Sequence, residues 1–116
     1  MIAERIGRLP ESLQAALRVA SVEGELFTAE LVARVQGTDE REMSARLSGE
    51  LDRRHRLIRA QSIVRVEDQL LSRYRFRHNL FQKYLYGSLD EVERVHLHEQ
   101  VGIALEGLCG TRDGIA

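Results

Sequence analysis

The sequence has few of the residues that cross-link a protein or anchor it in a membrane. One cysteine, one proline and no tryptophan occur among its 116 residues. With Cys109 as the only thiol the chain can form no internal disulfide, and no apolar run approaches the roughly 20 residues that span a bilayer. The N-terminal segment, interrupted by Glu4 and Pro10, lacks the apolar stretch of a signal peptide. The expected compartment is the reducing cytoplasm, with no membrane as a partner.

A strong charge of one sign is also lacking. The 17 lysines and arginines face 18 aspartates and glutamates, which gives a formal net charge of −1 at pH 7. The molecule as a whole is therefore not attracted to nucleic acid or to anionic lipid. Every cation except Lys83 is an arginine, a side chain suited to bidentate contacts with carboxylate or phosphate. Any binding of anions must come from a local patch.

Patterns typical of catalysis or metal binding are missing too. No glycine-rich phosphate loop ending in Gly-Lys occurs, and Cys109 has no evident base beside it. His96 and His98 are two residues apart, so on a helix they point to nearly opposite faces and do not suggest a zinc site. A chain of this length fits one domain of roughly 100–150 residues. We therefore expect a single non-catalytic domain with no cofactor and no metal of its own.

Apolar residues at helical spacing predict three helices in the first half of the chain, over residues 9–22, 28–37 and 39–53. Gly24 and Gly37 are placed to end the first two, because glycine readily adopts the conformation that follows a helix. The expected N-caps are Thr28 and Asp39, the latter with Glu42 at capping-box spacing, and the expected inward residues are Leu13, Ala16, Leu17, Ala20, Leu31, Val32, Val35, Met43, Leu47 and Leu51.

The period then changes to that of β-strands. Residues 57–66 and 71–76 are rich in branched and aromatic side chains and predict a β-hairpin across a polar link at 67–69. Such a hairpin must pack against helices, because two isolated strands are only marginally stable in water. Along the second strand Ser72, Tyr74 and Phe76 share one face, and Arg73, Arg75 and Arg77 share the other.

Two further helices are predicted after the hairpin. Asn79 can cap the first, and Gly87 allows it to end. Ser88 and Glu91 have capping-box spacing and open a longer helix, which runs through Val101, Ala104, Leu105 and Leu108 to Gly110.

The predicted fold class is therefore mostly α with a small β-hairpin, in the order of a winged helix-turn-helix with a C-terminal helical extension. Residues 1–78 are expected to form the winged-helix core of three helices and a wing. Residues 79–110 are expected to form C-terminal helices packed on that core, and residues 111–116 a disordered tail.

The third predicted helix bears on whether the chain binds DNA. Winged helices often read DNA with the start of this helix, which here carries Asp39, Glu40 and Glu42 and would repel phosphates. The cations of the run 53–56 follow at its far end, where the helix dipole favours them. Nucleic acid is therefore not the expected partner, although a DNA-binding domain of a transcriptional regulator stays open as an alternative.

The hairpin and the residue after it supply the other candidates for binding. Arg73, Arg75 and Arg77 form a row with steps of about 6.6–6.8 Å, which suits an acidic partner surface or protects an edge strand from aggregation. His78 lies between strand and helix, where an imidazole can donate to a phosphate oxygen or bond to the backbone. Both interpretations of each feature stay open on the residues alone.

A resemblance to a known family adds to these observations. The residues that carry it are the run from Tyr74 to Tyr86, Ser88-Leu89 and Leu97-His98, with Leu9-Pro10-Glu11, Ala20-Ser21-Val22 and Phe27 near the start. Through them the chain resembles the segment after the ATPase core in bacterial STAND-type AAA ATPases, large regulators with adenylate cyclase, kinase or LuxR-type output domains and often helical repeats. The resemblance implies a module that docks on a nucleotide-binding domain, where ATP or ADP is bound, and that precedes helical repeats.

The related NB-ARC proteins have a Met-His-Asp motif in their winged helix, whose histidine reaches bound ADP. Arg77-His78-Asn79 resembles that motif by position, which implies a nucleotide-sensing role for His78 with Arg77 and Asn79 beside it. Arg73 and Arg75 become candidates for contact between domains. This chain departs from the motif at two of three positions, and Asn79 cannot supply a carboxylate. A protein-interaction adaptor to a helical-repeat array stays open as a further alternative, as does a homo-oligomer.

Overall fold

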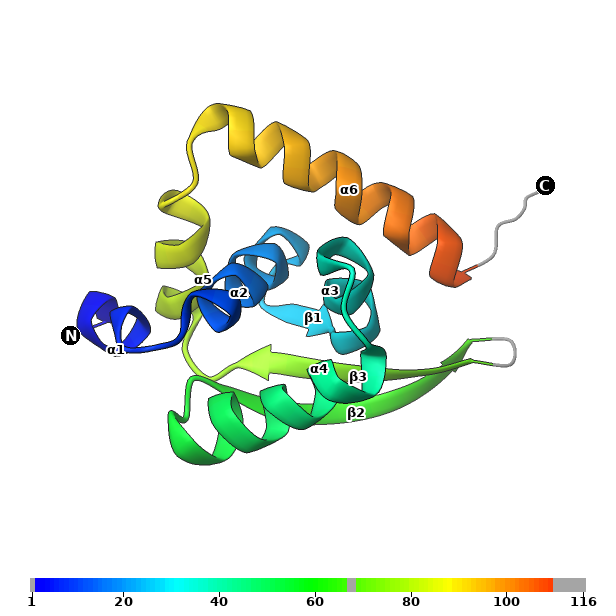
Figure 1. Ribbon diagram of the computed structural model, residues 1–116, viewed down its shortest axis with the longest axis horizontal. Helices are drawn as coiled ribbons and strands as arrows, with labels where there is room; N and C mark the ends of the chain where they lie inside the picture. Colours follow the sequence, from blue (N-terminus) through cyan, green and yellow to red (C-terminus); the bar gives the residue numbers. More distant parts are fainter. Residues whose placement is uncertain (1, 67–68, 110–116) are drawn as a thin grey trace.

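The computed structural model describes residues 2–66 and 69–109, which form a mostly helical protein with a small three-stranded antiparallel sheet (Figure 1). The tail predicted over 111–116 lies outside the described residues. In chain order the elements are α1 (Ile2–Gly7), α2 (Glu11–Glu23), β1 (Leu26–Thr28), α3 (Ala29–Gln36), α4 (Glu40–Arg46), the π-helical η1 (Leu47–Arg54), β2 (Ile58–Val66), β3 (Gln69–Phe76), α5 (Asn79–Gly87) and α6 (Glu91–Cys109).

The predicted helices of the first half are confirmed. Gly24 ends α2 with φ 126° and Gly37 ends α3 with φ 70°, conformations that glycine adopts without a steric penalty. The third helix changes from α to π geometry within its length, since the His55 N–H donates to the Glu50 carbonyl five residues back. All the predicted inward residues are buried except Val35, which is half-buried and packs against the core.

The predicted hairpin is confirmed, but the sheet has a third strand that the sequence pattern did not predict. β1 pairs with β3, so the order is β1-β3-β2 and β3 is the central strand. The Phe27 side chain in β1 is 0% exposed, and its ring centroid lies 6.0 Å from that of Tyr74 and 5.0 Å from that of Phe76. This aromatic group joins the sheet to the helical core.

The start of α5 differs from the prediction that Asn79 is its N-cap. Asn79 is the first residue of the helix, and His78 holds the N-cap position with φ −132° and ψ 137°. The His78 carbonyl accepts the Phe81 N–H at 3.0 Å. The reason is that Arg77 is still hydrogen-bonded to the Leu57 carbonyl beside β2, so the chain leaves the sheet only at His78.

The start of α6 also differs, since Ser88 and Glu91 do not form the predicted capping box. Asp90 and Glu93 form it instead: the Glu93 N–H donates to Asp90 Oδ1 at 2.8 Å, and the Asp90 N–H donates to Glu93 Oε1 at 3.1 Å. Ser88 belongs to the end of α5, because its hydroxyl donates to the Leu85 carbonyl at 2.7 Å.

Thr28 shows a third difference. It precedes α3 at the N-cap position, but its side chain makes no hydrogen bond to that helix. Its hydroxyl donates to Glu23 Oε2 at 3.0 Å instead, which ties the end of β1 to the end of α2.

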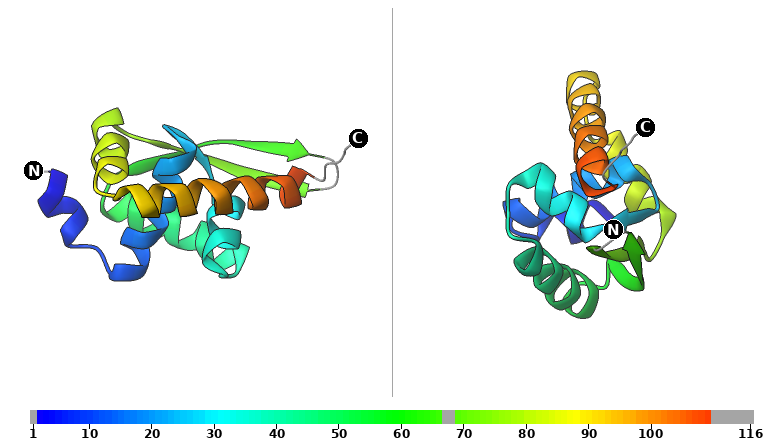
Figure 2. Two further views of the ribbon diagram at one scale, coloured as in Figure 1. Left: turned by 90° about the horizontal axis from the view of Figure 1, so that it is seen from above. Right: turned by 90° about the vertical axis from the view of Figure 1, so that its right-hand side faces the viewer.

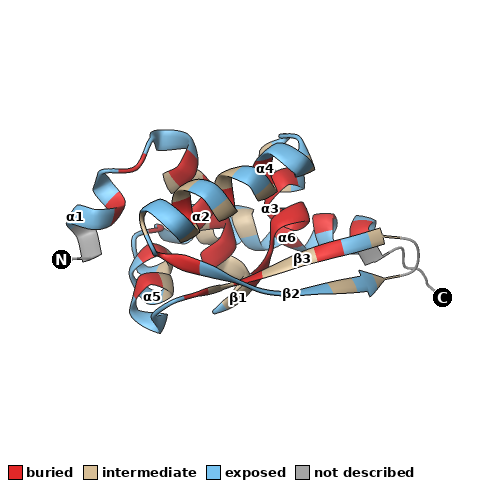
Figure 3. Cartoon of the chain, turned by 90° about the horizontal axis from the view of Figure 1, so that it is seen from below, coloured by how far each residue is buried: buried red, intermediate tan, exposed pale blue. Residues whose placement is uncertain are grey.

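Helix α6 forms a layer of its own. It packs on α2 and α3, on the side opposite η1. In the right-hand view of Figure 2 it projects at the top of the molecule. Of the apolar residues along this helix, Val101, Ala104 and Leu108 are buried against the core, whereas Leu105 is 45% exposed. Figure 3 shows buried residues concentrated on α2, α3 and β3, while most of β2 is exposed. Of the helices in the described ranges, none combines the length and the hydrophobicity that a membrane span requires.

Candidate functional site at the junction of β3 and α5

The predicted nucleotide-sensing residues lie at the junction of β3 and α5, and Arg77 fixes that junction to its neighbours. Its Nε donates to the Ile58 carbonyl at 3.0 Å, and its Nη2 donates to Oδ1 of Asp52 at 2.9 Å. Only 33% of its side chain is exposed. Arg77 is therefore a positioning residue that ties the junction to β2 and η1, and its guanidinium does not extend into solvent.

His78 follows with its side chain at the surface. The imidazole ring is exposed, and its edge packs against the ring of Phe81, with centroids 5.7 Å apart and an interplanar angle of 67°. Within the described part of the chain, the ring nitrogens make no hydrogen bond. The aromatic contact therefore orients the ring while both nitrogens stay available to an external group. Asn79, also exposed, begins α5 beside it.

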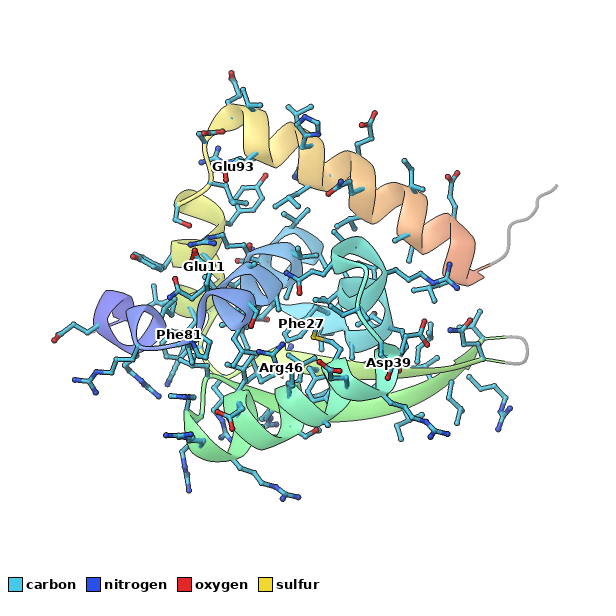
Figure 4. All side chains as sticks on the ribbon, in the orientation of Figure 1. Glu11, Phe27, Asp39, Arg46, Phe81 and Glu93 are labelled. Atoms are coloured by element: carbon cyan, nitrogen blue, oxygen red, sulfur yellow. The ribbon has the colours of Figure 1, made fainter. Side chains whose placement is uncertain are left out.

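Helix α1 brings a further cation to the same place. The Arg5 guanidinium lies over the Phe81 ring, with Cζ 5.2 Å from the centroid, and its Nη2 donates to the His55 carbonyl at 2.7 Å. Figure 4 shows Phe81 at the end of the molecule where α1 and α5 meet, with nitrogen-tipped side chains extending nearby from α1 and from the end of η1. We call this group the cationic end, and it consists of Arg5, Arg53, His55, Arg56 and His78.

The cationic end keeps most of its charge uncompensated. Arg5, Arg53 and Arg56 are exposed, and among residues 2–66 and 69–109 none of the three makes an ion pair. Arg56 adopts φ 54°, which is uncommon for a residue with a side chain. It lies in a turn closed by the Leu57 N–H, which donates to the Leu51 carbonyl at 2.9 Å. A tight turn thus holds these cations near the junction.

The row of arginines on β3 is different, because acids lie close to it. Arg75 lies 3.4 Å from Glu25, and the charge of Arg73 acts on Glu23. The row itself does not lie on an edge strand, because β3 lies between the two other strands, although the hairpin that carries it forms one edge of the sheet through β2. Arg59 of β2 is the register partner of Arg75, so two like charges sit side by side on one face. The two candidates for contact between domains thus differ: Arg75 pairs with Glu25, whereas Arg73 makes no ion pair with a described residue and acts on Glu23 only through its charge.

Two carboxylates support this part of the fold, Glu23 half-buried and Glu30 buried. Glu23 accepts the N–H and the hydroxyl of Thr28, both at 3.0 Å, and Glu30 accepts the N–H and the hydroxyl of Ser72 at 2.7 and 3.0 Å. Burial raises the pKa of Glu23 above its ordinary value of 4.5, while the hydrogen bonds from Thr28 and the charge of Arg73 lower it by less. Both carboxylates accept hydrogen bonds from residues of the strands, so we assign them a role in the fold and not in ligand binding.

His98 of α6 makes its contacts within the fold. His98 Nε2 lies 2.9 Å from the hydroxyl of Tyr86, and the Arg94 guanidinium lies over the Tyr86 ring, with Cζ 5.0 Å from the centroid. These contacts connect α6 to α5. In the described ranges, no three histidine, cysteine, aspartate or glutamate residues come close enough to hold a metal ion.

Two residues at the junction were not predicted from the sequence. Asp52 binds Arg77 across 25 positions, and Arg5 reaches Phe81 from a helix that precedes the first predicted one. Neither residue belongs to a local motif, so no signal short of the fold itself could have found them.

Comparisons with known proteins give no independent family for the chain. No protein-family model, no curated protein and no solved structure matches it. The argument for function therefore rests on the junction and on the residues of the sequence that carry the resemblance.

Proposed function

We propose that the chain is a winged-helix domain that acts as a non-catalytic regulatory module of a STAND-type ATPase. The order α2, β1, α3, α4 with η1, and then the β2–β3 wing supports the winged-helix assignment, and β1 extends the wing into a sheet. The resemblance of the run from Tyr74 to Tyr86 supports the family. That run covers the last three residues of β3, the junction, and α5 up to Tyr86.

In this proposal the junction docks on a nucleotide-binding domain and senses the phosphates held there. The single observation that carries it is the exposed His78 ring, oriented by Phe81 and free of hydrogen bonds within the described residues. An imidazole N–H beside uncompensated arginines suits a phosphate oxygen, because such a hydrogen bond is strengthened by charge. The nucleotide must contact the module differently in its ADP and ATP states, since only a difference in interaction can shift the equilibrium.

The test is ADP release from a complete polypeptide that contains this chain and its nucleotide-binding domain. We expect His78→Ala to speed ADP dissociation by tenfold or more, because losing a hydrogen bond to a charged group costs about 1.5–3 kcal/mol. Lys83→Ala is the control, since Lys83 is an exposed cation on the same helix and outside the cationic end. An ADP dissociation rate that His78→Ala leaves unchanged would remove His78 from the mechanism.

A second candidate is an adaptor that packs against helices of a partner. The observation that favours it is the number of exposed aliphatic side chains on α6, with Val92 68%, Val95 66% and Ile103 64% exposed. Both roles can coexist, because they use different surfaces.

A further inference from the structure

Helix α6 carries apolar side chains on opposite sides. Its inner face buries Val101, Ala104 and Leu108 against α2 and α3, whereas Val92 and Ile103 are more than half exposed. Exposed aliphatic side chains that gather beside a hollow can mark a surface on which another molecule packs. The surroundings of Val92 and Ile103 therefore decide whether α6 offers such a surface.

A groove runs along the flank of α6, between it and α2 and α3. Two hollows of about 480 and 470 Å³ adjoin there, and both are lined by Val35 and Gln100. On α6 they extend from Val92 to Gly107, which is about 22 Å along the helix, and Leu89 lines the same end from the turn before α6. We call this the α6 groove. Its apolar lining includes Val19, Val35, Leu89, Val92, Leu97 and Ile103.

The polar residues of the α6 groove are not distributed evenly. Arg18 of α2 and Arg34 of α3 lie on one side, at the two ends of the groove. Arg34 forms an ion pair with Glu40 at 3.8 Å, and each of the two side chains is more than 40% exposed. The side formed by α6 carries Glu93 near its start, and Figure 4 shows that residue beside the α5–α6 turn. The groove therefore offers cations to whatever faces α2 and α3.

We propose that the α6 groove binds an amphipathic α-helix of a partner protein or domain, with carboxylates along the flank that faces α2 and α3. Its length corresponds to about four helical turns, and helices bind such grooves through apolar residues at spacings of three and four. Carboxylates at both ends of that helix would meet Arg18 and Arg34, which sets its position along the groove. The inference goes beyond docking through His78 and uses none of the residues of the cationic end.

The experiment measures binding of two fluorescent 18-residue helical peptides by anisotropy. Both have the same leucine stripe, and they differ in having either glutamates or lysines along one flank. We expect the glutamate peptide to bind the chain at least tenfold more tightly than the lysine peptide. Arg18→Glu combined with Arg34→Glu should reverse that preference.

Matched variants of α6 distinguish binding in the groove from non-specific hydrophobic binding of the peptide. Val92→Ser with Ile103→Ser should weaken binding of the glutamate peptide at least tenfold. Val95→Ser with Leu105→Ser removes two exposed apolar side chains of the same helix that do not line the groove, and should change binding less than twofold. Thermal unfolding of all variants checks that they are folded.

Two results would overturn the proposal. One is equal binding of the two peptides, or equal loss in both double-serine variants. The other is sedimentation showing a dimer of the chain that Val92→Ser with Ile103→Ser dissociates, because the occupant would then be a second copy. Neither result bears on ADP release, so docking through His78 stands or falls separately.

Discussion

Arg77 and Asn79 are the two positions where the junction departs from the Met-His-Asp motif, and the structure gives them different roles. The Arg77 guanidinium joins three elements through Ile58 and Asp52, and a thioether could form neither hydrogen bond. Asn79 is exposed in the first turn of α5, where a carboxylate would be favoured by the helix dipole. The arginine at position 77 thus stabilises the fold, whereas the asparagine at position 79 does not.

Restoring the motif one residue at a time should therefore have effects of opposite sign. Arg77→Met is expected to lower the free energy of unfolding by about 1–2 kcal/mol, since it removes two hydrogen bonds of a partly exposed arginine. Asn79→Asp is expected to raise it by about 0.3–1 kcal/mol through the helix dipole. Urea unfolding of both variants at pH 7 checks this prediction. A stabilising Arg77→Met would contradict the positioning role.

The Glu23 carboxyl makes stability depend on pH. Its pKa is raised by burial in the folded chain, so between pH 4.5 and that higher value the folded state holds more protons than the unfolded one. Stability from this group is therefore fully present below pH 4.5 and is lost as pH rises through the folded pKa. Burial disfavours the charged form of this half-buried carboxyl, and Thr28 and Arg73 favour that form to a smaller extent.

Glu23→Gln should remove this dependence. A glutamine can accept the Thr28 N–H and donate to its hydroxyl, so the free energy of unfolding at pH 7 should fall by no more than about 0.5 kcal/mol, or rise. The variant should gain less stability than the native chain on going from pH 7 to pH 5. Glu25→Gln, at an exposed pair with Arg75, is the control and should keep the native difference. An unchanged difference in Glu23→Gln would contradict the assignment.

At the scale of elements, the sequence predicted the hairpin and every helix except α1, and it missed what depends on distant partners. β1 has three residues and exists because Leu26, Phe27 and Thr28 pair with residues 73–75, nearly 50 positions away. Periodicity cannot report such a pairing, because so short a segment shows no alternation of its own. Arg5 and Asp52 were not predicted for the same reason, since their partners are distant in sequence. His78 was predicted because it belongs to a local motif.

The boundary between α5 and α6 shows how two local signals can compete. Ser88 and Glu91, and Asp90 and Glu93, have the same capping-box spacing. Packing decides between them: Leu89 is only 3% exposed, and Ser88 closes α5, so α6 starts after Asp90. A start two residues earlier would require Ser88 to serve both helices.

Cap substitutions test this boundary. Asp90→Ala should lower the free energy of unfolding by about 1 kcal/mol, because it removes the side chain that accepts the Glu93 N–H. Glu91→Ala removes only a charge from the same turn and should cost no more than about 0.5 kcal/mol. Chemical denaturation of both variants makes the comparison, and a larger cost for Glu91→Ala would place the cap elsewhere.

At the scale of the whole molecule, two surfaces of different chemistry lie on different elements. The cationic end belongs to α1, the η1–β2 turn and the junction before α5, whereas the α6 groove belongs to α2, α3 and α6. The arginine row of β3, which the sequence alone marks as a binding surface, lies close to Glu23 and Glu25 and supports the fold. A module with two such surfaces can contact a nucleotide-binding domain and a helical partner at once.

Hydrogen exchange of the backbone amides of residues 77–81, measured in the complete polypeptide with ADP and with ATP bound, tests the central claim most directly. The account predicts slower exchange at this junction in the ADP state and faster exchange with ATP, with no such difference in β2 over residues 59–63. Equal exchange of the junction in the two states would contradict the proposal that it docks on the nucleotide-binding domain.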